Sequence, residues 1–213
     1  MALFSRIFLI ILVVAVHVRV VRADPVLPSR FQVQVADCDS ERTCNAQYDI
    51  VNWSKNAGYA ESQLPTCSCM DRWHCYLDVK ESLPKNIISL ITNQTTEYGP
   101  NCFNFAMYAS GLTSTIGHAT DVDIVNAIAG AKCEKIEPLL AASGDIGVID
   151  AFGEPTHAFV YLSPKIVLEK ERQDAAGLYR VVTLRQSEDP YPLDEYNPGD
   201  ALHVYRCPRW NGF

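Results

Sequence analysis

Eight cysteines constrain this chain more than any other feature, because five of them crowd into residues 38–75. Apolar periodicity is weak in that segment, and Asn, Ser, Thr and Gly are scattered through it. A segment that can bury little apolar surface is commonly held together by disulfides when it lies in an oxidising compartment. We therefore expect a disulfide-rich N-terminal extension over residues 24–77, with a cysteine pairing that the spacing leaves open.

The first 23 residues predict export. Arg6 precedes an apolar run from Ile7 to Val16, and Val21-Arg22-Ala23 closes the stretch where a signal peptidase would cleave. Polar residues interrupt the stretch after Val16, so the apolar run is too short to span a bilayer, although an N-terminal membrane anchor is the alternative. We expect a signal peptide over residues 1–23 and a periplasmic or extracellular protein with no stable membrane insertion once the signal is removed.

The sequence disfavours a metal site and a nucleic-acid or membrane interface. Cys67-Ser68-Cys69 with His74-Cys75 could gather a zinc ion, but an exported chain favours disulfides at these positions, so we predict no metal site. The signal holds three of the 18 basic residues and none of the 25 acidic ones, which leaves 15 against 25, a net charge of −10. An acidic chain without basic clusters argues against nucleic acid or an anionic membrane as the main partner.

Regular elements begin near residue 78. Pro100 and Gly111 bound a predicted helix over residues 100–110, a helix over residues 78–92 precedes it with Pro84 as an early break, and Thr120 with Asp123 could cap a third. From Ser143 onward an apolar period of two predicts strands, over residues 145–152, 156–162, 166–171, 178–185 and 201–206. Helices followed by a run of strands indicate an α+β fold with an antiparallel sheet, which we place in a domain over residues 78–213.

Cys102 lies at the predicted start of the second helix. A helix N-terminus presents free N–H groups and the positive end of the dipole, which favour a thiolate over a thiol. The same N–H groups can receive the oxyanion that forms when a thiolate attacks a carbonyl group. Taken alone, Cys102 is more simply explained as a buried or disulfide-bonded cysteine.

The predicted hairpin after residue 156 favours a chemical role. His157, Phe159 and Tyr161 share one face of their strand. If the turn is centred on Ser163, residue 161 pairs with 165, 159 with 167 and 157 with 169. His157 and Glu169 then lie opposite one another, with Cβ atoms about 5 Å apart. A carboxylate that orients an imidazole is what the base beside a thiol nucleophile requires.

This arrangement resembles the NlpC-type papain-like cysteine peptidases over about residues 95–172. The resemblance rests on Tyr98-Gly-x-x-Cys102, on Gly144-Asp145 opening a strand, and on His157-Ala-Phe-Val-Tyr-Leu-Ser. It implies that Cys102 is the nucleophile, His157 the base and acid, and Glu169 the residue that orients the histidine. Tyr98, Asn101 and Phe103 would lie near the substrate and the oxyanion. The chain departs from the family at Asn101-Cys102-Phe103-Asn104, where Asp-Cys-Ser-Gly is common, and at Glu169, where His, Asn or Gln is usual.

The resemblance implies a papain-like domain that cleaves an amide bond, with a bacterial cell-wall peptide as the leading substrate and no metal or organic cofactor. A disulfide-stapled binding or structural module without catalysis, on an inactive version of the fold, is the alternative. An exported thiol acyltransferase on the same scaffold is a third option. If Cys102 is a free thiol, seven cysteines remain, so another must be free, bonded to a second molecule, or paired with Cys102 in a latent form.

Overall fold

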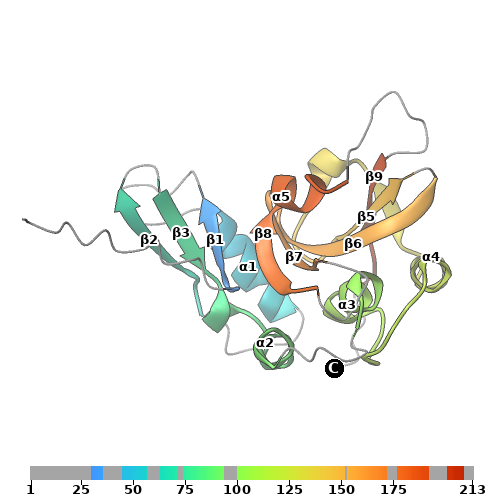
Figure 1. Ribbon diagram of the computed structural model, residues 1–213, viewed down its shortest axis with the longest axis horizontal. Coiled ribbons are helices and arrows are strands. Elements are labelled where there is room, and N and C mark those ends of the chain that lie inside the picture. Colours follow the sequence, from blue (N-terminus) through green and yellow to red (C-terminus); the bar gives the residue numbers. More distant parts are fainter. Residues whose placement is uncertain are drawn as a thin grey trace, which may run out of the picture.

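The computed structural model describes residues 30–35, 45–56, 63–71, 74–93, 100–151, 153–171, 177–191 and 201–208. The predicted signal peptide and Tyr98 lie outside these residues. The described part holds helices and two antiparallel sheets, which confirms the α+β class. In Figure 1 the smaller sheet lies at the left and the larger one at the right, with α2 and α3 below them.

The smaller sheet has three strands in the order β1-β3-β2. Its strands, in the cysteine-rich segment, are β1 (Gln32–Val35), β2 (Thr66–Asp71) and β3 (His74–Asp78). One helix, α1 (Asn45–Asn56), lies between β1 and β2, and two short helical segments follow β3: η1 (Lys80–Ser82) and α2 (Lys85–Thr92). The predicted helix over residues 78–92 is thus divided, because Pro84, which has no N–H, occupies the N-cap of α2.

The larger sheet has six strands in the order β4-β9-β5-β6-β7-β8. Its strands are β4 (Glu134–Ile136), β5 (Ile146–Ala151), β6 (Glu154–Ser163), β7 (Ile166–Lys170), β8 (Tyr179–Thr183) and β9 (Ala201–Arg206). Four helical segments accompany it: α3 (Cys102–Ala109), α4 (Asp121–Gly130), η2 (Pro138–Leu140) and α5 (Leu184–Glu188). Thr120 and Asp123 form a capping box at the start of α4, as their spacing suggested.

The cysteine-rich segment is packed as well as cross-linked. Val33, Ile50 and Leu77 from this segment share a hydrophobic cluster with Leu168 of β7 and Val181 of β8. The N–H of residue 181 also donates to the carbonyl of residue 30, at 3.2 Å, so the two sheets meet at β8. The shared cluster crosses the predicted boundary between residues 77 and 78, and the weak apolar periodicity of the segment concealed it.

The predicted register of the β6–β7 hairpin is wrong by two residues. Phe159 pairs with Glu169, and Tyr161 pairs with Val167, because the turn lies at residues 164–165 and not at Ser163, which itself pairs with Ile166. The displaced turn alone would shift the pairing by three residues, but a bulge between Tyr161 and Ser163 adds one residue to β6 and reduces the shift to two. A shift of two residues keeps each side chain on its face, so His157 and Glu169 still share one face, but as diagonal neighbours.

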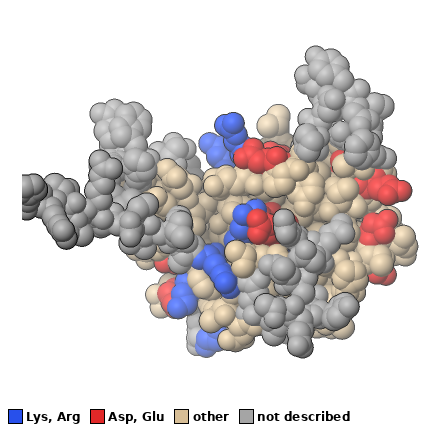
Figure 2. Space-filling model, viewed as in Figure 1, with Lys and Arg blue, Asp and Glu red and all other residues tan. Residues whose placement is uncertain are grey.

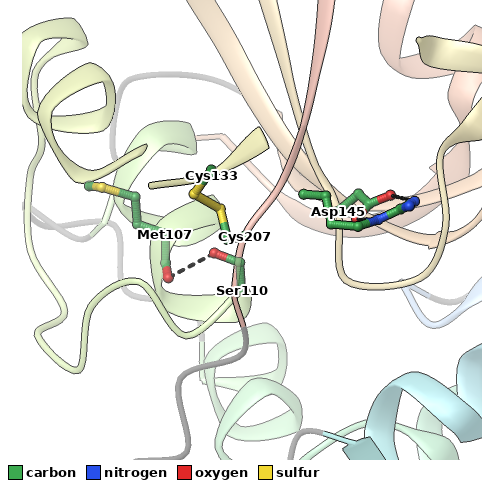
Figure 3. The surroundings of a disulfide bond; sticks show 6 residues. Met107, Ser110, Cys133, Asp145 and Cys207 are labelled. Atoms are coloured by element: carbon green, nitrogen blue, oxygen red, sulfur yellow. Dashed lines mark hydrogen bonds and ion pairs between the residues drawn. A yellow bond between two sulfur atoms is a disulfide. The ribbon is translucent and has the colours of Figure 1, made fainter. Parts of the chain in front are cut away.

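A disulfide and an ion pair hold β9 in the larger sheet. The Cys133–Cys207 disulfide joins the segment after α4 to the end of β9 (Figure 3). Beside it in sequence, Arg206 makes a bidentate contact with Asp145, with Nε–Oδ1 at 3.0 Å and Nη2–Oδ2 at 2.7 Å. These links fix β9, which pairs with β5. In turn, β5 pairs with β6, the strand that carries His157.

Candidate active site

Asn101 fixes the start of the helix that carries Cys102. Its Oδ1 accepts from the N–H of Asn104 at 3.1 Å, which is the N-cap bond of α3, and from the N–H of Ala119 at 3.2 Å. Its Nδ2 donates to the carbonyl of Ala119 at 2.6 Å. Asn101 therefore holds the chain before α4 against the first turn of α3, and these bonds engage both ends of its amide.

Asn104 makes a second set of bonds to the same chain segment. Its Nδ2 donates to the carbonyl of Thr115 at 3.1 Å, and its Oδ1 accepts from the N–H of Gly117 at 2.9 Å. Asn101 is 1% exposed and Asn104 is 6% exposed, so these bonds are shielded from water. The Asn-Cys-Phe-Asn sequence that departs from the family pattern thus has a structural explanation: two asparagines bind the segment between α3 and α4.

His157 lies next to a second bulge in the sheet. Ile149 pairs with His157, but Asp150 pairs with Pro155, so Thr156 is the extra residue on β6. Bulges commonly change the direction of a neighbouring side chain. The His157 side chain is 1% exposed, and its Nε2 lies 2.9 Å from Oε2 of Glu169, which is also 1% exposed. A buried carboxylate thus holds one nitrogen of a buried imidazole.

Glu169 accepts hydrogen bonds from three side chains. In addition to His157, Nε of Arg180 donates to Oε1 at 2.7 Å and the hydroxyl of Ser187 donates to Oε2. Arg180 is the cross-strand partner of Glu169 on β8, and Ser187 lies on α5. Burial alone would raise the pKa of Glu169, but His157, Ser187 and Arg180 outweigh it and lower the pKa. The carboxylate is therefore charged at neutral pH.

The Cys102 thiol is close enough to affect the protonation of His157. Burial disfavours the imidazolium, but hydrogen-bonding and charge interactions with Cys102 and Glu169 outweigh burial and raise the pKa of His157 to about 9. Nδ1 of His157 has no aligned hydrogen bond to any residue that the structure describes. The sulfur is thus near enough to influence the ring, while Nδ1 is left without a hydrogen bond among the described residues.

Cys102 is the one free thiol among the cysteines that the structure describes. It is wholly buried and belongs to a hydrophobic cluster with Ala158 and Val160, the residues that follow His157 on β6. This contact packs α3 on β6, the strand that carries the histidine. The sulfur has no exposed surface, so a substrate could reach it only after a neighbouring group moved.

A groove of about 380 Å³ lies beside these residues. It is lined by the two neighbours of Cys102, by Thr156 next to His157, and by residues before and at the start of α4 and β6: Asn101, Phe103, His118, Ala119, Thr120, Asp121, Glu154, Pro155 and Thr156. Two carboxylates and no Lys or Arg line it. Acidic side chains gather at the same end of the molecule, over α4 and the β5–β6 turn at the right of Figure 2.

The structure brings Cys102, His157 and Glu169 together, with Asn101 and Phe103 beside the groove. Tyr98 lies outside the described residues. Sequence reasoning missed Arg180, Ser187 and Tyr191, whose ring stacks on His157. The Thr183-x-x-Gln186 spacing is a capping-box signature that could have revealed α5 and hence Ser187. No sequence signal gave the register that pairs Arg180 with Glu169.

Cysteines 69 and 75 form a disulfide and Cys67 is also disulfide-bonded, so the zinc alternative at these residues is excluded. No cluster of metal-binding side chains occurs in the described ranges. Within the same ranges, no helix is both long and apolar enough to cross a bilayer. The disulfides are compatible with an exported protein.

Comparison of the chain with protein-family models, with curated proteins and with solved structures finds no match in any of the three.

Proposed function

We propose that this protein is an exported cysteine hydrolase that cleaves an amide or peptide bond with Cys102, His157 and Glu169. The observation that carries the proposal is the buried histidine, which a charged carboxylate holds through Nε2 while the pKa of its ring responds to the free thiol of Cys102. A nucleophile, a base and a group that orients the base are the three parts that covalent acyl transfer requires.

The proposed reaction has two halves. In the first, the proton of the Cys102 thiol is already held by the His157 imidazolium; the sulfur attacks the amide carbonyl carbon, and the imidazolium gives its proton to the leaving amine as the C–N bond breaks. In the second, His157 takes a proton from water, the resulting hydroxide attacks the thioester, and the C–S bond breaks. The carboxylic acid leaves, and the proton stays on His157 beside the freed sulfur, which restores the starting state. Glu169 stays charged throughout and stabilises the imidazolium.

The first turn of α3 supplies the groups that would hold the oxyanion. The N-cap bond uses the N–H of Asn104, whereas no hydrogen bond among the described residues uses the N–H of Cys102 or Phe103. These two N–H groups lie at the positive end of the helix dipole and are suited to a developing negative charge. Asn101 acts here through the helix cap: its Oδ1 accepts two hydrogen bonds and its Nδ2 donates one.

The fold we propose is papain-like, of the NlpC type, with the cysteine helix α3 packed on the antiparallel sheet that carries the histidine. The sequence resemblance and the contact between α3 and β6 support it. A peptide from bacterial peptidoglycan is the substrate that this resemblance favours, and the groove beside Cys102 is the place where such a chain could lie.

One observation favours a non-catalytic relative of the same fold. Cys102 is 0% exposed, and a nucleophile that substrate cannot reach does no chemistry. In that alternative the His157–Glu169 pair would serve only to stabilise the sheet. The free thiol argues against the version of this alternative in which every cysteine is bridged.

Hydrolysis of purified peptidoglycan and of its soluble stem peptides tests the proposal, with mass spectrometry to identify the bond that is cut. We expect the mature protein to release new amino and carboxyl ends, and Cys102→Ala and His157→Ala to lose this activity while they remain folded. His203→Ala is the matched control, because His203 also pairs with a carboxylate, Asp150 at 3.2 Å, on a neighbouring strand. Cleavage by Cys102→Ala at the wild-type rate would exclude the mechanism.

A further inference from the structure

One aromatic side chain covers the histidine of the proposed site. The ring of Tyr191 stacks on the imidazole of His157, with centroids 4.9 Å apart and an angle of 15° between the planes. Phe159, the next aromatic residue on the His157 face, lies farther away, at 6.0 Å and 43°. Near-parallel contact at this distance is a favourable geometry for two aromatic rings and stabilises the pair beyond the effect of area burial alone.

Tyr191 is fixed to a segment that also touches Glu169. Its N–H donates to the carbonyl of Glu188 at 2.8 Å, so it continues directly from α5. That helix begins at a capping box formed by Thr183 and Gln186 and carries Ser187, whose hydroxyl donates to Glu169. One short segment therefore provides a hydrogen bond to the carboxylate and a ring over the imidazole that the carboxylate holds.

The electrostatics of Tyr191 place it near the other two members of the site. Burial, followed by the proximity of Cys102 and Glu169, raises the pKa of the Tyr191 hydroxyl to about 12. The phenol is therefore neutral at any pH at which a thiol enzyme works. The ring of Tyr191 is the part that contacts the imidazole.

We propose that Tyr191 is a positioning residue, whose stacked ring holds the His157 imidazole in plane with Glu169 and keeps water from the hydrogen bond between them. The contact between the rings restricts rotation of the imidazole about its χ2 angle. Exclusion of water strengthens the His157–Glu169 interaction, because charges attract more strongly where the local dielectric constant is low. This inference concerns the proposed catalytic site, but the contact it describes can be measured without any substrate.

The test is proton NMR of the Nε2–H of His157, which resonates downfield when it is hydrogen-bonded to a carboxylate. The readout is the rate at which this proton exchanges with water. We expect Tyr191→Phe to match the wild type, because the ring remains. Tyr191→Leu keeps an apolar side chain but has no ring plane, so we expect exchange of this proton to become about two- to tenfold faster, in proportion to the lost stacking energy. Tyr205→Leu is the control, because Tyr205 contacts a different histidine, His203, at 6.5 Å.

Unchanged exchange in Tyr191→Leu, or an equal loss of protection in Tyr205→Leu, would overturn the proposal. If Tyr191→Leu fails to fold, the wild-type protein still decides the matter, because a stacked pair gives nuclear Overhauser effects between the rings of Tyr191 and His157, and their absence contradicts it. If a substrate is found, Tyr191→Leu should lower kcat more than it changes KM. Failure to find a substrate leaves the exchange result standing, so the two proposals can fail separately.

Discussion

Replacement of Glu169 by glutamine removes the charge that stabilises the His157 imidazolium while the side chain keeps its size. In the wild type, burial disfavours the imidazolium, yet interactions with Cys102 and Glu169 raise the pKa of His157 from 6.5 to about 9. An opposite charge at close range raises such a pKa by about 1 to 3 units. Since Cys102 remains in the variant, we expect the pKa of His157 to fall by about 1 to 2 units.

The same substitution changes how stability depends on pH. The pKa of His157 is higher in the folded protein than its ordinary value of 6.5, so protonation favours the folded state. This stabilisation is complete below pH 6.5, is lost as the pH rises through about 9, and amounts to about 3 kcal/mol. In Glu169→Gln we expect the pH-dependent part to be reduced to about half of that, and the loss to occur at lower pH.

Two measurements check this prediction: NMR titration of the histidine ring signals, and urea unfolding across the same pH range. Glu171→Gln is the matched control, because Glu171 also contacts Arg180, at 3.3 Å, and neutralising it leaves the bond between His157 and Glu169 in place. The reasoning is refuted if His157 titrates at the same pH in Glu169→Gln as in the wild type, or if Glu171→Gln lowers its pKa equally.

Asn101→Ala removes the cap of α3 and the bonds to Ala119, so we expect the free energy of unfolding to fall by about 1 to 2 kcal/mol in urea titrations; a change below about 0.5 kcal/mol contradicts this role. Gly147→Ala would place a Cβ atom 2.2 Å from the Phe159 ring, and we expect a loss of about 1 to 3 kcal/mol that Phe159→Leu partly restores. If Gly147→Ala is as stable as the wild type, the close packing described here is wrong. Removal of the Cys133–Cys207 disulfide by a double substitution to serine should cost about 2 to 5 kcal/mol in thermal unfolding, and an unchanged midpoint contradicts its part in holding β9.

The second half of the chain could be predicted well from local patterns. The apolar period of two located β5 to β9 within a few residues, and proline and capping residues located α3 and α4. These signals act within a few residues along the chain. The strands of the cysteine-rich segment escaped detection because their apolar residues are few, and they become buried only through contact with β7, β8 and α2.

The candidate site was accessible to prediction only in part. His157 and Glu169 could be assigned to one face because strand parity survives a shift of two residues, although the pairing itself was wrong. The bulge at Thr156, the contact of α3 with β6, and the bonds of Arg180 and Ser187 to Glu169 depend on tertiary packing and left no local signal that fixed them.

The central claim is that Cys102 is a nucleophile activated by His157, and its reactivity in the native protein tests this most directly. The measurement is the rate of alkylation by iodoacetamide at neutral pH, followed by intact mass and located by peptide mapping. We predict a modification at Cys102 that becomes more than about tenfold slower in His157→Ala and is unchanged in His203→Ala, since a thiol without an imidazolium partner is only a few per cent thiolate at this pH. A Cys102 that stays unmodified until the protein is unfolded, or that is recovered in a disulfide, would contradict the account.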